Sequence, residues 1–161
     1  MTPPKEISGR LKNIRIRMKN REIDVLVIYS APGSIRFGQK GHIMYISGYE
    51  SYFGDAMIIL PCDENLSPLL EKGAADYFPP ECTWIENVRP AGDHVQTLKK
   101  YLRETKLEKS RVGVVGEYST SPSLFARVQR EVGQWQIEVA SEILHACKRL
   151  PGNKSKNKAL K

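Results

Sequence analysis

Four aromatic or acidic side chains gather in one short stretch, and they are the chain's best candidates for chemistry. Tyr49, Tyr52, Phe53 and Asp55 lie in the turn-like insert 48–55, between two apolar runs that read as strands. A loop that presents such side chains can contact a ligand or a partner subunit. The alternative is that two of them pack into the sheet edge while the others are turn residues. The sequence leaves both interpretations open.

The histidines, cysteines and serines show no spacing that is typical of catalysis. His42, His94 and His145 have no second histidine or acid at metal-ligand spacing, and no GxSxG, GxGxxG or Walker motif is present. We therefore expect no catalytic residue, no metal and no cofactor in this chain. The odd number and wide separation of the cysteines predict reduced thiols in a cytoplasmic protein. They are Cys62, Cys82 and Cys147.

One glycine pair matches a short motif of RNA-binding proteins. Gly38–Gly41 has the GxxG spacing of the loop that KH domains place between two helices. The residues that follow, His42–Ile46, are β-branched and aromatic and therefore predict a strand. On that basis we do not expect a KH domain.

Positive charge is concentrated at the end of the chain. The formal net charge is +7, and six of these charges come from Lys148 and the residues after it. Met1–Cys147 therefore carries only about +1. A basic tail at 151–161 can bind polyanions, so a stand-alone module that uses this tail for nucleic acid is an alternative function. Solvated tails are commoner, however, and nucleic acid is not the partner we expect. No apolar run approaches about 18 residues, so we expect no membrane span.

Apolar periodicity predicts strands that first follow one another closely and later alternate with helices. The early strands therefore read as hairpins and the later ones as crossover units. This order predicts an α/β fold, a three-layer domain with a mixed β-sheet flanked by helices. Helices are expected at 6–22, 94–106, 121–132 and 141–148, and strands at 24–30, 43–47, 56–61, 67–71, 83–85, 111–116 and 136–140.

Several of these segments together resemble a known family. Tyr45–Tyr49 (YISGY) is similar to the "Y-L-[TS]-G-[FYW]" signature in the N-terminal domain of the creatinase/prolidase family, and Tyr52–Gly54 (YFG) extends the match toward creatinase-like members. The acid-led apolar strand at Asp24–Tyr29 and the segment RVGVVGEYST at Arg111–Thr120 occur in the family's order. A closing "VAS" at Val139–Ser141 completes the set.

The resemblance covers Ile7–Leu150 and implies an RNase H-like domain of the creatinase N-terminal type. In that family a "pita-bread" domain follows and holds two divalent metal ions, which cleave Xaa-Pro bonds or creatine. Residues 1–150 would then be the N-terminal-like domain and 151–161 a basic hinge or tail, with the catalytic domain absent. The implied partners are the protein's own catalytic domain and a second copy in a homodimer.

One position departs from the creatinase-like pattern. Those members place an arginine directly after Phe-Gly, where it is suited to bind a substrate carboxylate. Here the residue is Asp55. An acid would repel a carboxylate, so the resemblance implies a cationic or neutral group at this position instead. We expect Tyr52 and Asp55 to be exposed and Phe53 to be half-buried at the sheet edge.

Overall fold

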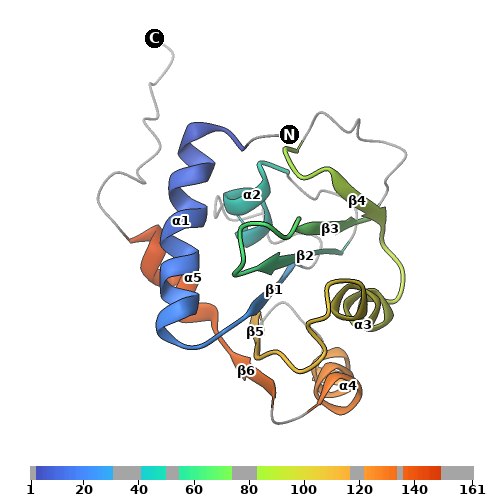
Figure 1. Cartoon of the computed structure of the whole chain (residues 1–161). Helices are drawn as coiled ribbons and strands as arrows, with labels where there is room; N and C mark the ends of the chain where they lie inside the picture. Colours follow the sequence, from blue (N-terminus) through green and yellow to red (C-terminus); the bar gives the residue numbers. More distant parts are fainter. Residues whose placement is uncertain are drawn as a thin grey trace.

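The backbone is built around a six-stranded mixed sheet with strand order β4-β3-β2-β1-β5-β6 (Figure 1). The structure, a computed structural model, describes residues 3–30, 41–49, 55–73, 83–116, 122–133 and 136–149. β2 runs antiparallel to β1 and β3, while the other neighbouring pairs are parallel. The strands are β1 (Val25–Ser30), β2 (Ala56–Pro61), β3 (Leu69–Lys72), β4 (Asn87–Pro90), β5 (Val112–Val115) and β6 (Ile137–Val139).

Both faces of the sheet are covered by helices, which gives the three layers predicted from the sequence. α1 (Lys5–Asn20), α2 (His42–Ser47) and α5 (Ser141–Lys148) pack on one face. α3 (His94–Glu104) and α4 (Pro122–Val132) pack on the other. Figure 1 shows α1 beside α5 and α3 beside α4. The α/β class and the mixed sheet are thus confirmed.

The central strands are almost entirely apolar because each of their faces meets a helix layer. Every residue of β1 and β2 is buried. Alternate side chains point to opposite faces, so Leu26 and Ile28 join the α1 layer while Val27 and Tyr29 join the α3 layer. In this way β1 takes part in both cores.

The prediction of a strand at 43–47 is wrong, because this segment is the short helix α2. Gly48 ends the helix in the left-handed region, with φ of 75°, and its amide donates to the Met44 carbonyl. A left-handed residue after the last turn is a common helix ending. The strand that spoke against a KH domain is therefore absent, and the architecture is defined instead by the six-stranded sheet described above.

Two smaller differences concern the second half of the sheet. The structure has no strand at 83–85, and β4 is formed by Asn87–Pro90 instead. Pro90 fits there because it is the last residue of an outer strand, where a missing N–H costs no ladder bond.

The tail 151–161 and its division from 1–150 lie outside the described residues. In the part of the chain that is described, no helix is long and apolar enough to cross a membrane.

Candidate functional site

One edge of the sheet collects the strand ends where ligands usually bind in folds of this kind. β1, β3, β4, β5 and β6 run in the same direction and end at this edge, and β2 begins there. The helices that follow the neighbouring strands β1 and β5 lie on opposite faces of the sheet. Such a divergence is a topological switch point, which in open α/β sheets marks the ligand crevice. We call it the carboxyl edge.

Tyr29 and Asp55 meet at this edge, near the end of β1 and just before β2. The Tyr29 side chain is hydrogen-bonded to Asp55, although Tyr29 is only 7% exposed. Burial raises the pKa of the Tyr29 phenol, and the hydrogen bond to Asp55 and its charge raise that pKa further. The phenol therefore stays protonated and donates to the carboxylate. Asp55 is half-buried, and its carbonyl accepts a bond of 3.1 Å from the Gly73 amide.

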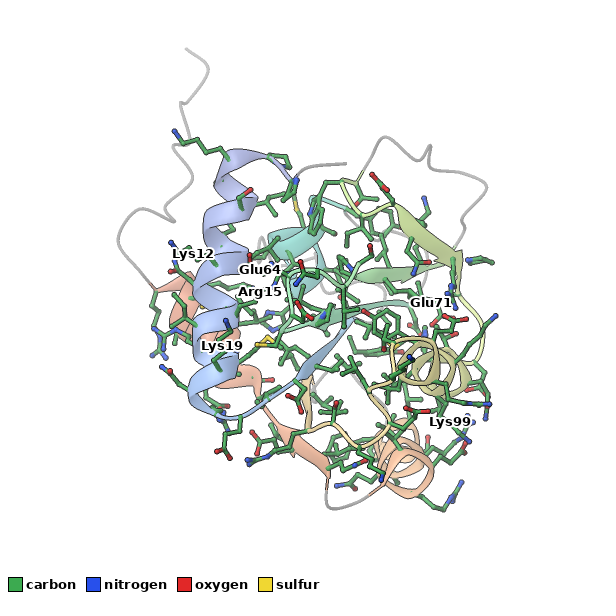
Figure 2. The ribbon with its side chains drawn as sticks, in the orientation of Figure 1. Lys12, Arg15, Lys19, Glu64, Glu71 and Lys99 are labelled. Carbon is green, nitrogen blue, oxygen red and sulfur yellow. The ribbon has the colours of Figure 1, made fainter. Side chains whose placement is uncertain are left out.

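A buried acid and histidine lie on the same face of the sheet. Glu71, in β3 and labelled in Figure 2, is 1% exposed. Its carboxylate lies 2.7 Å from Nδ1 of His94 at the start of α3. The other carboxylate oxygen accepts bonds from the Gly92 amide at 2.9 Å and the Thr97 hydroxyl at 3.0 Å. Burial raises the pKa of Glu71, but these three partners outweigh it and hold the pKa below its usual value. Glu71 therefore fixes the start of α3.

His94 joins this acid to the Tyr29–Asp55 pair. The His94 ring meets the Tyr29 ring edge-on, with centroids 5.3 Å apart and an interplanar angle of 81°. An edge-to-face contact of this kind is a favoured aromatic geometry. A continuous set of contacts thus runs from Asp55 through Tyr29 and His94 to Glu71. We call these four residues the edge cluster.

Tyr49 and Lys72 lie at the same carboxyl edge but on the other face of the sheet. Both are buried, at 2% and 3% exposure, and the Lys72 ammonium lies 5.3 Å from the centre of the Tyr49 ring. A cation over an aromatic face is stabilising when both are shielded from water. The Tyr49 amide also donates to the Ser47 hydroxyl at 3.0 Å. Tyr49 therefore belongs to the core of this chain.

An apolar recess opens beside the edge cluster, between the sheet and the helices α3 and α4. It is lined in part by Tyr29 and His94 and by Leu124, Phe125 and Val128 of α4. Its free volume is only about 20 Å³, so it is a shallow recess. The nearby polar atoms of Glu71 are already engaged, so the recess is suited to packing and not to chemical attack.

The residues predicted from the sequence have different positions in the structure. Asp55 was expected to be exposed, but it is half-buried and its side chain is hydrogen-bonded to Tyr29. Tyr49 is buried. Tyr52 and Phe53 lie outside the described residues. The role of these four side chains in contacting a substrate or partner remains a prediction.

Sequence reasoning did not identify Tyr29, Glu71 or His94 as members of a cluster. His94 was expected to be a surface or core histidine, and it is a core histidine with an acid partner. In the sequence, Tyr29 and Asp55 had only one feature in common: each lies next to the end of a predicted strand. A period-2 pattern extended back from β2 puts Asp55 on the face of Met57, which is paired with Tyr29. That register was the one signal available.

Comparisons with known proteins agree with this architecture. A family model described as the creatinase/prolidase N-terminal domain matches residues 10–148. A search of curated proteins finds no match.

Solved structures share the fold at low identity. An X-Pro aminopeptidase from Thermotoga maritima is 21% identical with a TM-score of 0.66, over 88% of this chain and 36% of that one. The prolidase from Pyrococcus horikoshii is 16% identical with a TM-score of 0.63, over 91% and 36%. A creatinase/prolidase-like N-terminal domain from Corynebacterium diphtheriae is 17% identical with a TM-score of 0.51, over 84% and 94%.

Proposed function

Because the chain belongs to the creatinase/prolidase N-terminal domain family, we propose that it is the non-catalytic N-terminal part of a metallohydrolase of the Xaa-Pro peptidase type. Its work would be to form a homodimer, to dock its own catalytic domain and to shape the substrate pocket. The observation that carries the proposal is the match of 10–148 to the N-terminal domain model. The chain spans 36% of two enzymes that share its fold, and 97% and 98% of two other chains named as Xaa-Pro aminopeptidases. The alternative of a stand-alone nucleic-acid module gains no support from this match.

The two metal ions of such an enzyme would belong to its catalytic domain. Among the described residues no group of three or more histidine, cysteine, aspartate or glutamate side chains is placed to hold a metal ion. The buried acid Glu71 is engaged by His94, Thr97 and the Gly92 amide. The described residues therefore do not fit a two-metal site, and we assign no catalytic step to them.

The edge cluster supports a role in recognition. Tyr29 holds the Asp55 carboxylate in place, and Asp55 remains only half-buried. A carboxylate fixed in this way would attract a cationic or neutral group of a substrate or partner and repel an anionic one. If Tyr52, Phe53 and Asp55 contact a substrate as expected from the sequence, Asp55 would then select against a substrate carboxylate beside it.

The first test uses the chain as it stands. We expect the purified chain to hydrolyse neither Xaa-Pro dipeptides nor creatine, with or without Mn²⁺, Zn²⁺ or Co²⁺, because a two-metal site needs several converging donors. Light scattering after gel filtration would show whether the chain forms a dimer. Metal-dependent turnover that is lost on substitution of His42, His94 or His145 would contradict the proposal.

The second test uses a protein in which this domain is joined to a catalytic domain. Asp55→Ala should change kcat/KM for cationic substrates, and Tyr29→Phe should do so more weakly because it frees the carboxylate without removing it. Asp55→Ala also leaves the Tyr29 hydroxyl without its acceptor, which costs about 1–3 kcal/mol of folding stability. A stability loss of that size with unchanged kcat/KM for every substrate would make the contact purely structural.

A further inference from the structure

Helix α1 has a strongly positive net charge, unlike the rest of the chain before the tail. It contains six lysine or arginine residues and only one acid, Glu6. Residues 1–147 together carry about +1, so the remainder of that segment is net acidic. Its apolar side is already used, since four side chains of α1 are buried against the sheet and α5. They are Ile7, Leu11, Ile14 and Met18.

The cations of α1 are mostly not neutralised by neighbouring acids. Within the described ranges, Arg10 pairs with Glu6, but the other five have no carboxylate at ion-pair distance. These five are Lys5, Lys12, Arg15, Arg17 and Lys19. Burial raises the pKa of the nearby Cys62 thiol, the charges of Lys19 and Arg15 lower it, and the charges of Asp24 and Asp63 raise it. Among the described residues, neither aspartate lies at ion-pair distance from Lys19 or Arg15.

The opposite face of the molecule shows a different arrangement. On α3, Lys99 lies 3.6 Å from Glu131 and Lys100 lies 3.8 Å from Glu104. On α4, Arg127 pairs with Asp93 at 2.9 Å and with Glu131 at 3.2 Å. Figure 2 shows Lys12, Arg15 and Lys19 along α1 and Lys99 on the far side of the sheet. These cations of α3 and α4 are thus matched by carboxylates at ion-pair distance. Five of the six cations of α1 have no such partner among the described residues, although Figure 2 shows Glu64 near Lys12 and Arg15.

An exposed apolar side chain lies within the uncompensated stripe. Ile16 is 48% exposed, and it shares the outer side of α1 with the exposed Lys12 and Lys19 at a spacing of one helical turn. Arg15 lies beside it and is partly fixed by a bond of 3.3 Å from its Nε to the Pro61 carbonyl. We call Lys12, Arg15, Ile16 and Lys19 the α1 stripe.

We propose that the α1 stripe is an interaction surface for a protein partner that presents carboxylates around an apolar side chain. Charge complementarity and the exposed Ile16 favour such a partner, because arginine and apolar side chains together are typical of protein interfaces. A polymer of phosphates would be bound by the cations alone and would leave Ile16 in water. Insertion into a lipid surface needs a free apolar helix face, and that face of α1 is buried. A second copy that offered the same stripe would place cations against cations.

The test follows the amide spectrum of the isotope-labelled full chain by NMR during titration with a synthetic peptide. The probe is a peptide of about twelve residues with repeats of Glu-Leu-Glu-Glu, long enough to cover the stripe. A second peptide has serine in place of each leucine, and an oligothymidylate of equal charge is the third probe. We expect the shift changes to centre on Lys12, Ile16 and Lys19 and binding to weaken between about 50 and 200 mM salt.

Substitutions separate the stripe from positive charge in general. Lys12→Gln with Lys19→Gln should weaken binding of the leucine peptide by about fivefold or more, and Ile16→Ser should weaken it by about threefold. The matched control, Lys99→Gln with Lys100→Gln on α3, should leave the dissociation constant within about twofold. Thermal melts of each variant confirm that it is folded.

Four results would overturn the proposal. They are no saturable binding of the leucine peptide, equal affinity for the serine peptide or the oligothymidylate, shift changes centred on the lysines of 154–161, and equal weakening by the α3 control. None of these depends on peptidase activity, so the proposed metallohydrolase function can fail while this surface stands, and the reverse also holds.

Discussion

The carboxylate of Glu71 lies 2.7 Å from the imidazole of His94, with both side chains at least nine-tenths buried. Removal of one partner leaves a polar group without its bond inside the core. We therefore expect Glu71→Ala to lower the free energy of unfolding by about 3–5 kcal/mol, measured by urea denaturation. The control, Glu104→Ala, removes an exposed acid paired with Arg89 at 3.1 Å and should cost less than about 1 kcal/mol. Equal losses in the two variants would refute this view of the buried pair.

The same acid predicts how stability changes at low pH. The pKa of Glu71 is held below its ordinary value of 4.5, so the unfolded chain binds its proton first as the pH falls. The contribution of Glu71 is then fully present above about pH 4.5 and is lost as the pH drops through the lower folded pKa. In Glu71→Gln the free energy of unfolding should fall less steeply between about pH 5 and pH 3. A slope identical to that of the wild type would show that other groups govern acid unfolding.

The Tyr29–Asp55 bond can be detected by the titration of the phenol. Burial, and then the bond to Asp55 and its charge, raise the pKa of Tyr29 above 10.0. Asp55→Asn should lower that pKa toward 10 without reaching it, because burial remains. NMR of ring-labelled tyrosine, assigned with Tyr29→Phe, measures the change.

Tyr101 supplies the internal reference for this titration. Burial raises the pKa of Tyr101 to about 12, opposed by the charge of Arg15, and its hydroxyl donates to the Ser67 carbonyl at 2.8 Å. Asp55→Asn should leave its pKa unchanged. For both tyrosines the stabilising contribution is present below pH 10 and is lost as the pH rises toward the folded pKa. A shift of Tyr101 as large as that of Tyr29 would indicate a global loosening.

Gly116 and Gly9 should respond to alanine in opposite ways. Gly116 follows β5 with φ of 90°, and an added Cβ would lie 2.3 Å from the Tyr29 carbonyl oxygen. Gly116→Ala should therefore destabilise the chain by about 2–4 kcal/mol. Gly9 lies in α1 with nothing within 4 Å of an added Cβ, so Gly9→Ala should stabilise it by about 0.5–1 kcal/mol. Urea denaturation of the two variants, measured side by side, tests the signs.

The sequence was sufficient for elements that are long or fully apolar. The helix predicted at 6–22 and the strand predicted at 24–30 are present as α1 and β1, with Leu11, Ile14 and Met18 on the buried side of α1. The sequence was not sufficient for α2, because a six-residue helix shows no full period. Its β-branched and aromatic residues match the composition of a strand as well as that of a helix buried on most sides.

The edge cluster was beyond sequence reasoning for a different reason. Glu71 and His94 are 23 positions apart, and the bond between them depends on the pairing of β3 with β2 and on where α3 begins. Asp93 caps α3 by accepting from the amides of Val95 and Gln96, which sets the position of His94 relative to Glu71. No local pattern contains this register, so the residue types alone left His94 as either a surface or a core histidine.

The two outer strands determine how the chain can meet other copies of itself. β6 has three residues, and β4 has four and ends in Pro90, which has no N–H to offer. Exposed strand edges are templates for polymerisation, and short edges with a proline are a common defence against it. Sheet extension across molecules is thus disfavoured at both ends of the sheet. A second copy is therefore expected to associate through helices and loops, so crowded solutions of this domain should yield discrete oligomers and not fibrils.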